Sequence, residues 1–214
     1  MKKERLDVIL VQKGLVESRD KAKRTIMAGL VTVDGRVEDK AGQKFDPELE
    51  FAVKQKLCPY VSRGGLKLEK AMNCFPIDLK DGVCMDMGAS TGGFTDCMLQ
   101  NGARKVYALD VGYGQLDYKL RVDPRVVNME KTSIRYLDTD LIEEPVDFVS
   151  IDVSFISVKH MFPVVRKVLD SSGHMVCLIK PQFEAGREQV GKNGIVRDPA
   201  VHRQVIENVL RYAC

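Results

Sequence analysis

The sequence predicts an α/β protein built from a small basic N-terminal domain and a larger domain with a doubly wound parallel sheet. From about residue 60 onward, apolar strand-like segments alternate with helix-like segments, an order that produces a parallel sheet covered by helices. A glycine-rich stretch follows the first of these strands. The net charge of the 214 residues is +3, and residues 1–60, with 13 basic and 10 acidic side chains, hold all of that excess.

Composition excludes several classes of protein. The chain is 44% apolar and 29% charged, which is typical of a folded globular protein. No segment approaches the roughly 18 apolar residues of a membrane span, and the charged N-terminus lacks the apolar segment of a secretory signal. The six cysteines form no Cys-x-x-Cys pair, and only three histidines accompany them. We therefore predict a cytoplasmic protein without a bound metal; the sequence leaves its oligomeric state open.

The first 60 residues predict two helices followed by short strands. Leu6, Ile9 and Leu10 have the spacing of an amphipathic helix, which Gly14 ends. Ser18 is a suitable N-cap for a second helix. The further expected features are an inward row of Ala22, Thr25 and Ile26, a helix end at Gly29, strands over 31–33 and 51–53, and a hairpin turn at Asp34-Gly35.

Basic side chains gather on the second helix, at Arg19, Lys21, Lys23 and Arg24. Such a row can neutralise the phosphates of a nucleic acid, which gives affinity but little sequence discrimination. A solvated helix face explains the same charges, and charge alone favours that simpler reading.

The N-terminal pattern resembles the S4-type RNA-binding module of ribosomal proteins, pseudouridine synthases and tyrosyl-tRNA synthetases. The matching frame is Arg5-Leu6-Asp7, Leu10, Gly14, Ser18-Arg19, Ala22, Ile26, Gly29, Val31, Val33 and Asp34-Gly35. The resemblance implies that the second helix lays its cations along an RNA backbone. The residues expected to contact RNA are Lys3, Arg5, Arg19, Lys21, Lys23, Arg24 and, in the following domain, Arg63.

The domain boundary is expected near residue 60, because Pro59 favours an extended chain at Cys58. This gives domains over 1–60 and 61–214. In the second domain we expect strands over 83–87, 106–110, 126–129, 146–152 and 174–180, and helices over 65–74, 94–99, 157–169 and 199–212.

Three charged residues close strands of the predicted sheet: Asp110, Asp152 and Lys180. Ligands of such sheets bind at the carboxyl ends of the strands, so these residues and the glycine loop 88–93 predict one shared site. A single such residue would more simply cap a strand in solvent. The loop matches neither the G-x-G-x-x-G fingerprint nor the P-loop. Since a carboxylate at Asp110 suits two ribose hydroxyls, both a dinucleotide and an adenosyl ligand remain open.

A longer pattern resembles the FtsJ-type methyltransferase domain, which has a Rossmann-like fold. It comprises Asp86-x-Gly88-x-Ser90-x-Gly92-Gly93-Phe94, Leu109-Asp110-Val111-Gly112, Ser150-Ile151-Asp152-Val153-Ser154-Phe155 and Ile179-Lys180-Pro181-Gln182-Phe183-Glu184. With Ser62-Arg63-Gly64-Gly65-x-Lys67-Leu68 and the S4-type module, the whole chain resembles the TlyA family, named haemolysins in older usage.

This resemblance implies 2′-O-methylation of ribosomal RNA, at cytidines of both subunits, with S-adenosyl-L-methionine as methyl donor. The residues implied to bind that cofactor are Asp86, Gly88, Ala89, Ser90, Thr91, Gly92, Gly93, Phe94, Asp110, Val111, Ser133, Ile134 and Asp152.

The resemblance also implies a catalytic Lys-Asp-Lys-Glu set, whose first three members fall on Lys67, Asp152 and Lys180. A lysine can act as a base only when its pKa is lowered from about 10.4, by burial or a second cation. We expect Lys180 to take the proton of the ribose hydroxyl, Lys67 to steady the ribose oxygen, and Asp152 to position Lys180 and favour the sulfonium. Without the resemblance, Lys67 would be read as a surface residue of an amphipathic helix.

The family's glutamate lies in a strand after the last helix, and this sequence stops at Cys214. Neither Glu184 nor Glu207 stands in the matching motif, so we expect a sheet lacking its final strands and weak methyl transfer. The glycine-containing segment 184–198 is expected to be either a mobile substrate-facing loop or a simple surface connection.

Three other functions are alternatives to methyl transfer. A non-catalytic, ribosome-associated RNA-binding protein would use the same N-terminal module. A membrane-lytic haemolysin would need an apolar span or a strongly amphipathic cationic helix, and the sequence has neither. A nicotinamide oxidoreductase is the most distant alternative.

Overall fold

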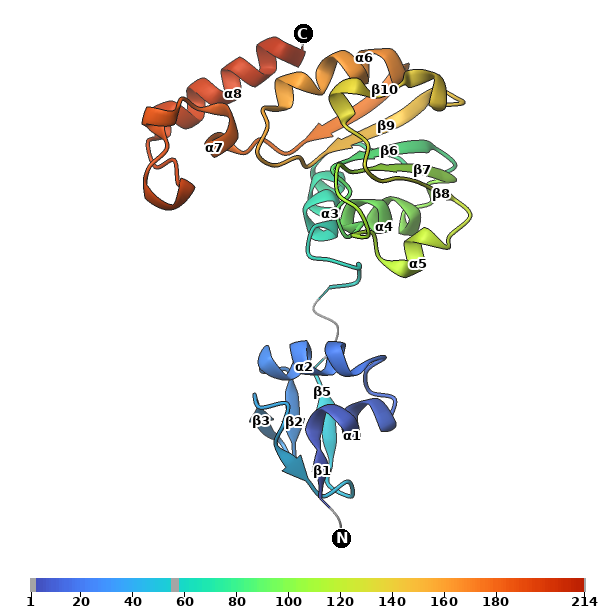
Figure 1. Cartoon of the computed structure of the whole chain (residues 1–214), viewed down its shortest axis with the longest axis vertical. Coiled ribbons are helices and arrows are strands. Elements are labelled where there is room, and N and C mark those ends of the chain that lie inside the picture. The colour runs from blue at the N-terminus through green and yellow to red at the C-terminus, as the bar shows by residue number, and fades with distance from the viewer. Residues whose placement is uncertain (1–2, 55–57, 214) are drawn as a thin grey trace. The chain divides into compact units, whose positions relative to one another are not determined.

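The computed structural model describes residues 3–54 and 58–213. The chain divides into two compact units, Met1–Pro59 and Tyr60–Cys214, and each is described separately (Figure 1).

The N-terminal unit packs two helices against short antiparallel strands. Its three-stranded sheet has the order β3-β2-β5, and β1 pairs with β4 in a second ribbon. The Oγ of Ser18 accepts a hydrogen bond from the backbone N–H of Lys21, which confirms the predicted cap. The elements are β1 (Glu4–Arg5), α1 (Leu6–Gln12), α2 (Arg19–Met27), β2 (Val31–Val33), β3 (Arg36–Glu38), β4 (Lys44–Phe45) and β5 (Phe51–Val53).

The hairpin between β2 and β3 turns at Asp34 and Gly35, which have φ values of 48° and 79°. Two positive φ values in a two-residue turn match the right-handed twist of the flanking strands, as the Asp-Gly pair predicts. The core of this unit includes Leu6, Ile9 and Ile26, all at most 1% exposed. The helix spacing therefore predicts the buried face correctly.

The larger unit contains a five-stranded parallel sheet with the order β10-β9-β6-β7-β8. The chain builds one half of the sheet outward from β6 and then crosses to build the other half from β9. The strand order therefore reverses between β6 and β9, and such a reversal opens a crevice at the strand ends. The strands are β6 (Val83–Met87), β7 (Lys105–Leu109), β8 (Val126–Met129), β9 (Val146–Ile151) and β10 (Leu169–Cys177).

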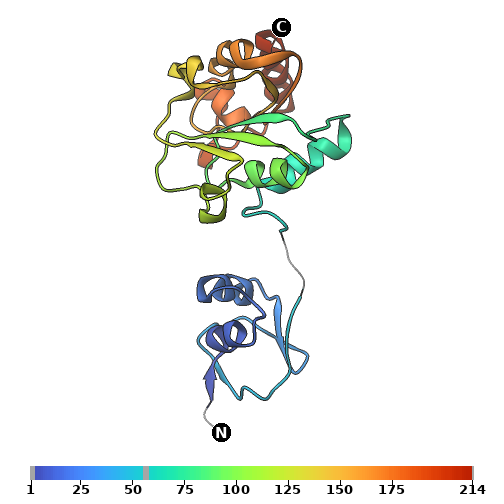
Figure 2. The ribbon, with the colours of Figure 1, turned by 90° about the vertical axis from the view of Figure 1, so that its right-hand side faces the viewer.

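Helices cover both faces of this sheet (Figures 1 and 2). One face carries α3, α4 and α5, and the other carries α6, with Val209 of α8 joining the core there. The helices are α3 (Gly65–Cys74), α4 (Gly93–Gln100), α5 (Tyr118–Arg121), α6 (Phe162–Val168), α7 (Pro181–Glu184) and α8 (Pro199–Ala213).

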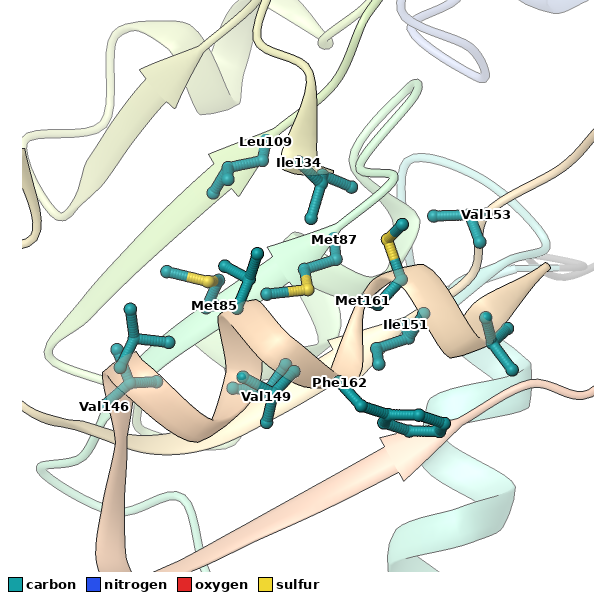
Figure 3. Close-up of a cluster of buried hydrophobic side chains, with 14 of the residues drawn as sticks. Met85, Met87, Leu109, Ile134, Val146, Val149, Ile151, Val153, Met161 and Phe162 are labelled. Carbon is teal, nitrogen blue, oxygen red and sulfur yellow. The ribbon is translucent and has the colours of Figure 1, made fainter. Parts of the chain in front are cut away.

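Side chains along a strand point alternately to the two faces of the sheet, so successive residues of β6 have different surroundings. Met85 and Met87 of β6 pack with Ile151 and Phe162 in the core beneath α6 (Figure 3). The intervening Asp86 points toward α4, where it contacts Thr95. The period of two thus sends apolar side chains to one face and a carboxylate to the other.

Two predicted boundaries were wrong. The helix expected over 157–169 is a 3-10 turn, Val158–His160, followed by α6, because Pro163 fits only the first turn of a helix. The strand expected over 174–180 is β10, Leu169–Cys177, since Pro181 opens a new helical turn for which Lys180 is the N-cap.

Candidate active site

Three charged side chains from distant parts of the chain meet at the carboxyl end of the sheet. Asp152 directly follows β9, Lys180 comes three residues after β10, and Lys67 lies in the first turn of α3. The Lys67 Nζ lies 2.8 Å from Asp152 Oδ2, and the Lys180 Nζ lies 2.5 Å from Asp152 Oδ1. The structure therefore brings together all three residues that the sequence predicts to be catalytic.

Lys180 has further oxygen neighbours. Its Nζ donates hydrogen bonds to the carbonyl oxygen of Val153 and to the Oγ of Ser154, both at 2.8 Å. Its side chain is 19% exposed, whereas that of Lys67 is 49% exposed. Lys67 therefore presents its amine to solvent, and Lys180 is held within the protein.

Asp152 is ionised in this arrangement. Burial opposes its negative charge, but hydrogen bonds and the charges of Lys180 and Lys67 outweigh burial and hold the pKa of this carboxyl below its ordinary value. One carboxylate thus binds two ammonium groups and keeps them close together.

Close approach of two glycines sets the position of Lys67. A Cβ on Gly93, at the start of α4, would lie 2.8 Å from the backbone N of Gly65. A Cβ on Gly65 would lie 2.4 Å from the ring of Tyr60. Larger residues would push α3 away from α4, and Lys67 would lose its reach to Asp152.

A second carboxylate, that of Asp86, lines the same cavity and makes no ion pair within residues 3–54 and 58–213. Asp86, 1% exposed, accepts hydrogen bonds from the backbone N–H and hydroxyl of Thr95 and from the hydroxyl of Ser150. Burial raises the pKa of Asp86 to about 6, although these hydrogen bonds oppose the rise. Asp86 thus joins β6, β9 and α4 directly beneath the site.

The glycine loop passes very close to the end of β9. Gly88 has a φ of 93°, and a Cβ there would lie 2.8 Å from the carbonyl oxygen of Asp152. Only glycine fits this position. Asp110 fixes the loop from the other side, since its two carboxylate oxygens accept hydrogen bonds from the backbone N–H groups of Ser90 and Gly112. Two lone-pair sites on that carboxylate remain for a ligand.

A cavity of about 250 Å³ lies between this loop and the three charged residues. Among the predicted site residues, the loop and the catalytic three line it, while Gly92, Asp110, Val111, Ser133 and Ile134 do not. The lining residues are Ser62, Gly64, Lys67, Asp86, Gly88, Ala89, Ser90, Thr91, Gly93, Phe94, Asp152, Ser154 and Lys180.

Three of the predicted residues that do not line the cavity, Gly92, Val111 and Ile134, lie elsewhere in the larger unit. Gly92 is packed among the side chains of Leu116 and Leu120. Val111 is 71% exposed, and Ile134 is 6% exposed and belongs to the core. The segment before Ile134 does lie beside Asp110, because the backbone N–H of Thr132 donates to the Asp110 carbonyl oxygen.

Sequence reasoning missed two hydroxyl groups at the site. Ser62 and Ser154 both line the cavity, and Ser154 contacts Lys180 directly. Both lie within the motifs that resemble the methyltransferase family. Their closeness in sequence to Lys67 and Asp152 could therefore have indicated them. Nothing in a strand pattern fixes the direction of a side chain after the strand has ended.

Hydrogen bonds hold the start of the segment that follows Lys180 against the segment that follows Asp152. The Glu184 carboxylate accepts hydrogen bonds from the hydroxyl of Ser157 (2.6 Å) and the backbone N–H of Val158 (2.8 Å). The rings of Phe155 and Phe183 also meet, with centroids 5.2 Å apart. The segments that carry Asp152 and Lys180 are therefore joined to each other beyond the ion pair.

Four of the six N-terminal residues that are predicted to contact RNA form ion pairs. Asp7, whose side chain is 0% exposed, pairs with both Arg5 and Arg19. On α2, Lys21 pairs with Glu17 and Lys23 with Asp20. The remaining predicted RNA contacts, Lys3, Arg24 and Arg63, are all exposed.

Family models match both units. The model of the FtsJ-like methyltransferase matches residues 60–214, and the model of the S4 domain matches residues 4–51. The chain belongs to the FtsJ-like methyltransferase family. Its five-stranded parallel sheet lies within the region matched by the FtsJ-like model, and the S4 domain precedes it in the chain.

Curated relatives and a solved structure extend over nearly the whole chain. The Bacillus subtilis protein YqxC, whose name provisionally makes it an rRNA methyltransferase, is 54% identical over 99% of this chain and 76% of its own. The 16S/23S rRNA (cytidine-2′-O)-methyltransferase TlyA of Mycobacterium tuberculosis is 42% identical over 98% of this chain and 78% of its own. A solved Streptococcus thermophilus protein named as a hemolysin is 52% identical, with a TM-score of 0.74, over all of this chain and 78% of that one.

Proposed function

We propose that this protein transfers a methyl group from S-adenosyl-L-methionine to the ribose 2′-hydroxyl of cytidines in ribosomal RNA. The observation that carries the proposal is the contact of Lys67 and Lys180 with one carboxylate, Asp152, beside the glycine loop. The name of the Mycobacterium tuberculosis relative supports both the reaction and the cytidine substrate.

The residues of the cavity fit this cofactor. Its sulfonium and amino groups are cationic and its ribose carries two hydroxyl donors, and the site offers carboxylates for each. Asp86 and Asp152 line the cavity, and Asp110 at its margin retains free lone pairs. When bound, the cofactor would supply the electrophilic methyl group.

The protein's own residues prepare the ribose oxygen. Lys180 takes the proton of the 2′-hydroxyl, and Lys67, the more exposed amine, steadies the oxygen as negative charge develops on it. Asp152 fixes both amines by its two ion pairs. Much of the acceleration comes from alignment, which can contribute roughly 7–11 kcal/mol in well-oriented reactions.

We propose that residues 1–60 bind RNA and residues 61–214 carry out catalysis. The S4 model match supports the first assignment. Because phosphate contacts position a protein without reading bases, the S4 domain would deliver the catalytic domain to structured RNA, and the cavity would select the nucleotide.

Methyl transfer to unmodified ribosomal subunits tests the proposal. Purified full-length protein is incubated with radiolabelled S-adenosyl-L-methionine and subunits, and the modified nucleotide is mapped by resistance of its 3′ phosphodiester to alkali. We expect label on the ribose of a cytidine. Lys67→Met should abolish it, while Lys70→Met, which removes an exposed lysine one turn along α3, should not. Binding of RNA without transfer by the wild type would instead identify a non-catalytic RNA-binding protein.

A membrane-lytic function rests on names alone. Hemolysin A of Brachyspira hyodysenteriae is 45% identical over 96% of this chain and 86% of its own. Within residues 3–54 and 58–213, no helix is long and apolar enough to cross a membrane.

A further inference from the structure

Ser154 occupies a distinctive position in the cavity. It follows Asp152 by two residues, it is exposed, and its Oγ lies 2.8 Å from the Lys180 Nζ. Neither the fold nor the three-residue cluster requires a hydroxyl group there. The surroundings of the Lys180 amine show what this hydroxyl can do.

Three oxygens lie within 2.8 Å of the Lys180 Nζ: Asp152 Oδ1, the Val153 carbonyl oxygen and Ser154 Oγ. A protonated lysine has three N–H bonds, so these oxygens take up the directions that the side chain leaves open. A base must receive a proton along one of the same directions. A substrate hydroxyl therefore reaches this amine only by passing through, or displacing, one of the three oxygens.

The three oxygens differ in chemistry. A carboxylate and a carbonyl can only accept hydrogen bonds, whereas a serine hydroxyl can accept one and donate one at the same time. The residues also differ in access. Val153 is 7% exposed and the Asp152 side chain 15%, while Ser154 is exposed on the cavity side. Ser154 alone combines access with a transferable proton.

We propose that Ser154 relays the proton of the substrate hydroxyl to Lys180. The transfer starts from the neutral amine of Lys180, after the ammonium has released one proton to solvent. The O–H bond of the ribose then breaks as a new O–H bond forms on Ser154, and the former Ser154 O–H bond breaks as an N–H bond forms on Lys180. The proton ends on Lys180, Ser154 returns to its original form, and the ribose oxygen keeps the electron pair with which it takes the methyl group. The inference rests on the proposed function.

A purely structural role for Ser154 predicts the opposite result. If the hydroxyl only accepted a hydrogen bond from the Lys180 ammonium, its removal would favour the neutral amine, and the rate near neutral pH would rise. If the hydroxyl relays the proton, its removal lowers the rate at every pH. The sign of the change therefore separates the two roles.

The test compares Ser154→Ala, Ser154→Thr and a matched control, Ser172→Ala. Ser172 is an exposed serine of the same unit whose hydroxyl donates to Asp170, and it does not line the cavity. Single-turnover methyl transfer is measured on unmodified subunits from pH 6 to 9. We expect Ser154→Ala to lose about 10- to 100-fold, less than the roughly 10²- to 10⁴-fold contribution typical of proton transfer, because a water molecule can replace the hydroxyl in part. Ser154→Thr, which keeps a hydroxyl, should recover most of the rate.

A solvent isotope experiment adds an independent readout. Two protons move together in the relay, so the wild-type rate should fall along a curve, and not along a line, as the fraction of D₂O increases. Calorimetric binding of S-adenosyl-L-methionine to each variant checks that the cavity is intact. Transfer by Ser154→Ala at or above the wild-type rate would overturn the relay alone. Absence of transfer by the wild type would overturn the proposed function and the relay with it.

Discussion

Each unit of this protein holds two cations on one carboxylate, and the two clusters differ in the chemistry that their cations allow. In the N-terminal unit, Asp7 pairs with Arg5 and Arg19. In the larger unit, Asp152 pairs with Lys67 and Lys180. Arg5 lies only two residues from Asp7 in the sequence, whereas Lys67 lies 85 residues from Asp152.

The cations decide what each cluster can do. A guanidinium group stays charged and offers a rigid fork of donors, so Arg5 and Arg19 can hold phosphates but cannot exchange protons. A lysine amine can lose its proton when its surroundings favour the neutral form. Exposure sets Lys180 apart, because its side chain is only 19% exposed, whereas those of Arg5, Arg19 and Lys67 are 44%, 55% and 49% exposed.

Exchanging the two types of cation gives the largest expected effect. Lys180→Arg keeps the charge beside Asp152 but removes the proposed base, so methyl transfer should fall about 10²- to 10⁴-fold while cofactor binding persists. Arg19→Lys keeps the charge beside Asp7, and RNA affinity should change little. Single-turnover transfer and filter binding measure the two outcomes.

The matched control for the first exchange is Lys167→Arg, at an exposed lysine of α6. It should leave transfer unchanged. Equal transfer by Lys180→Arg and wild type would show that the amine at Lys180 serves only as a charge, and the contrast between the clusters would lose its chemical basis.

Replacement of Asp86, a carboxylate that forms no ion pair among the residues that the structure describes, gives the next largest expected effect. Burial raises the pKa of Asp86 to about 6, so the folded protein binds this proton more tightly than the unfolded chain does. The resulting contribution to stability is present below about pH 4 and is lost as pH rises to about 6, a change on the order of 3 kcal/mol. Asp86→Asn should remove this pH dependence.

Urea unfolding of wild type and Asp86→Asn between pH 4.5 and 7 measures the effect. The stability of the variant relative to wild type should increase with pH across this range. Parallel stability curves for the two proteins would contradict the raised pKa of Asp86.

Removal of the carboxylate from the arginine cluster should have a smaller effect. Hydrogen bonds from Arg5, with those of Arg19, hold the pKa of Asp7 below its ordinary value, although burial opposes this. Its contribution to stability is therefore present above about pH 4 and is lost as pH falls, the reverse of Asp86. Asp7→Asn should destabilise the N-terminal unit by roughly 1–2 kcal/mol at neutral pH, since the arginines left behind can reach water.

Thermal unfolding followed by hydrogen exchange locates this loss within residues 3–54. Asp39→Asn, at an exposed carboxylate of the same unit, is the control. A loss in the larger unit, or none at pH 7, would show that Asp7 does not stabilise the fold through its arginines.

The two clusters also show how far sequence reasoning reaches. Alternation of strands and helices predicts the sheet, because the apolar period is long enough to read in β6, β7 and β9. It misses β1 and β4, which are two residues each and too short to show any period. Within the site, Asp152 and Lys180 follow from their place after strands.

Lys67 is different, because its contact with Asp152 joins residues 85 positions apart. No local pattern carries that information, and only the resemblance to a family suggested it. Ser154 illustrates a second limit. Its position after β9 is evident from the sequence, but the direction of its hydroxyl depends on the backbone beyond the strand, where the neighbouring Phe155 has a φ of 64°.

The smallest expected effect comes from replacing Arg24. Arg24 of α2 is exposed and makes no ion pair within residues 3–54 and 58–213. If it contacts one RNA phosphate, Arg24→Ala should weaken RNA binding by a few-fold and reduce the slope of log affinity against log salt by about 0.7–0.9. Methyl transfer at saturating RNA should not change, because the cavity is untouched. Arg36→Ala removes an exposed arginine of β3 and serves as the control. Equal loss of salt dependence in both variants would mean that RNA responds to the net charge of the unit and not to the surface of α2.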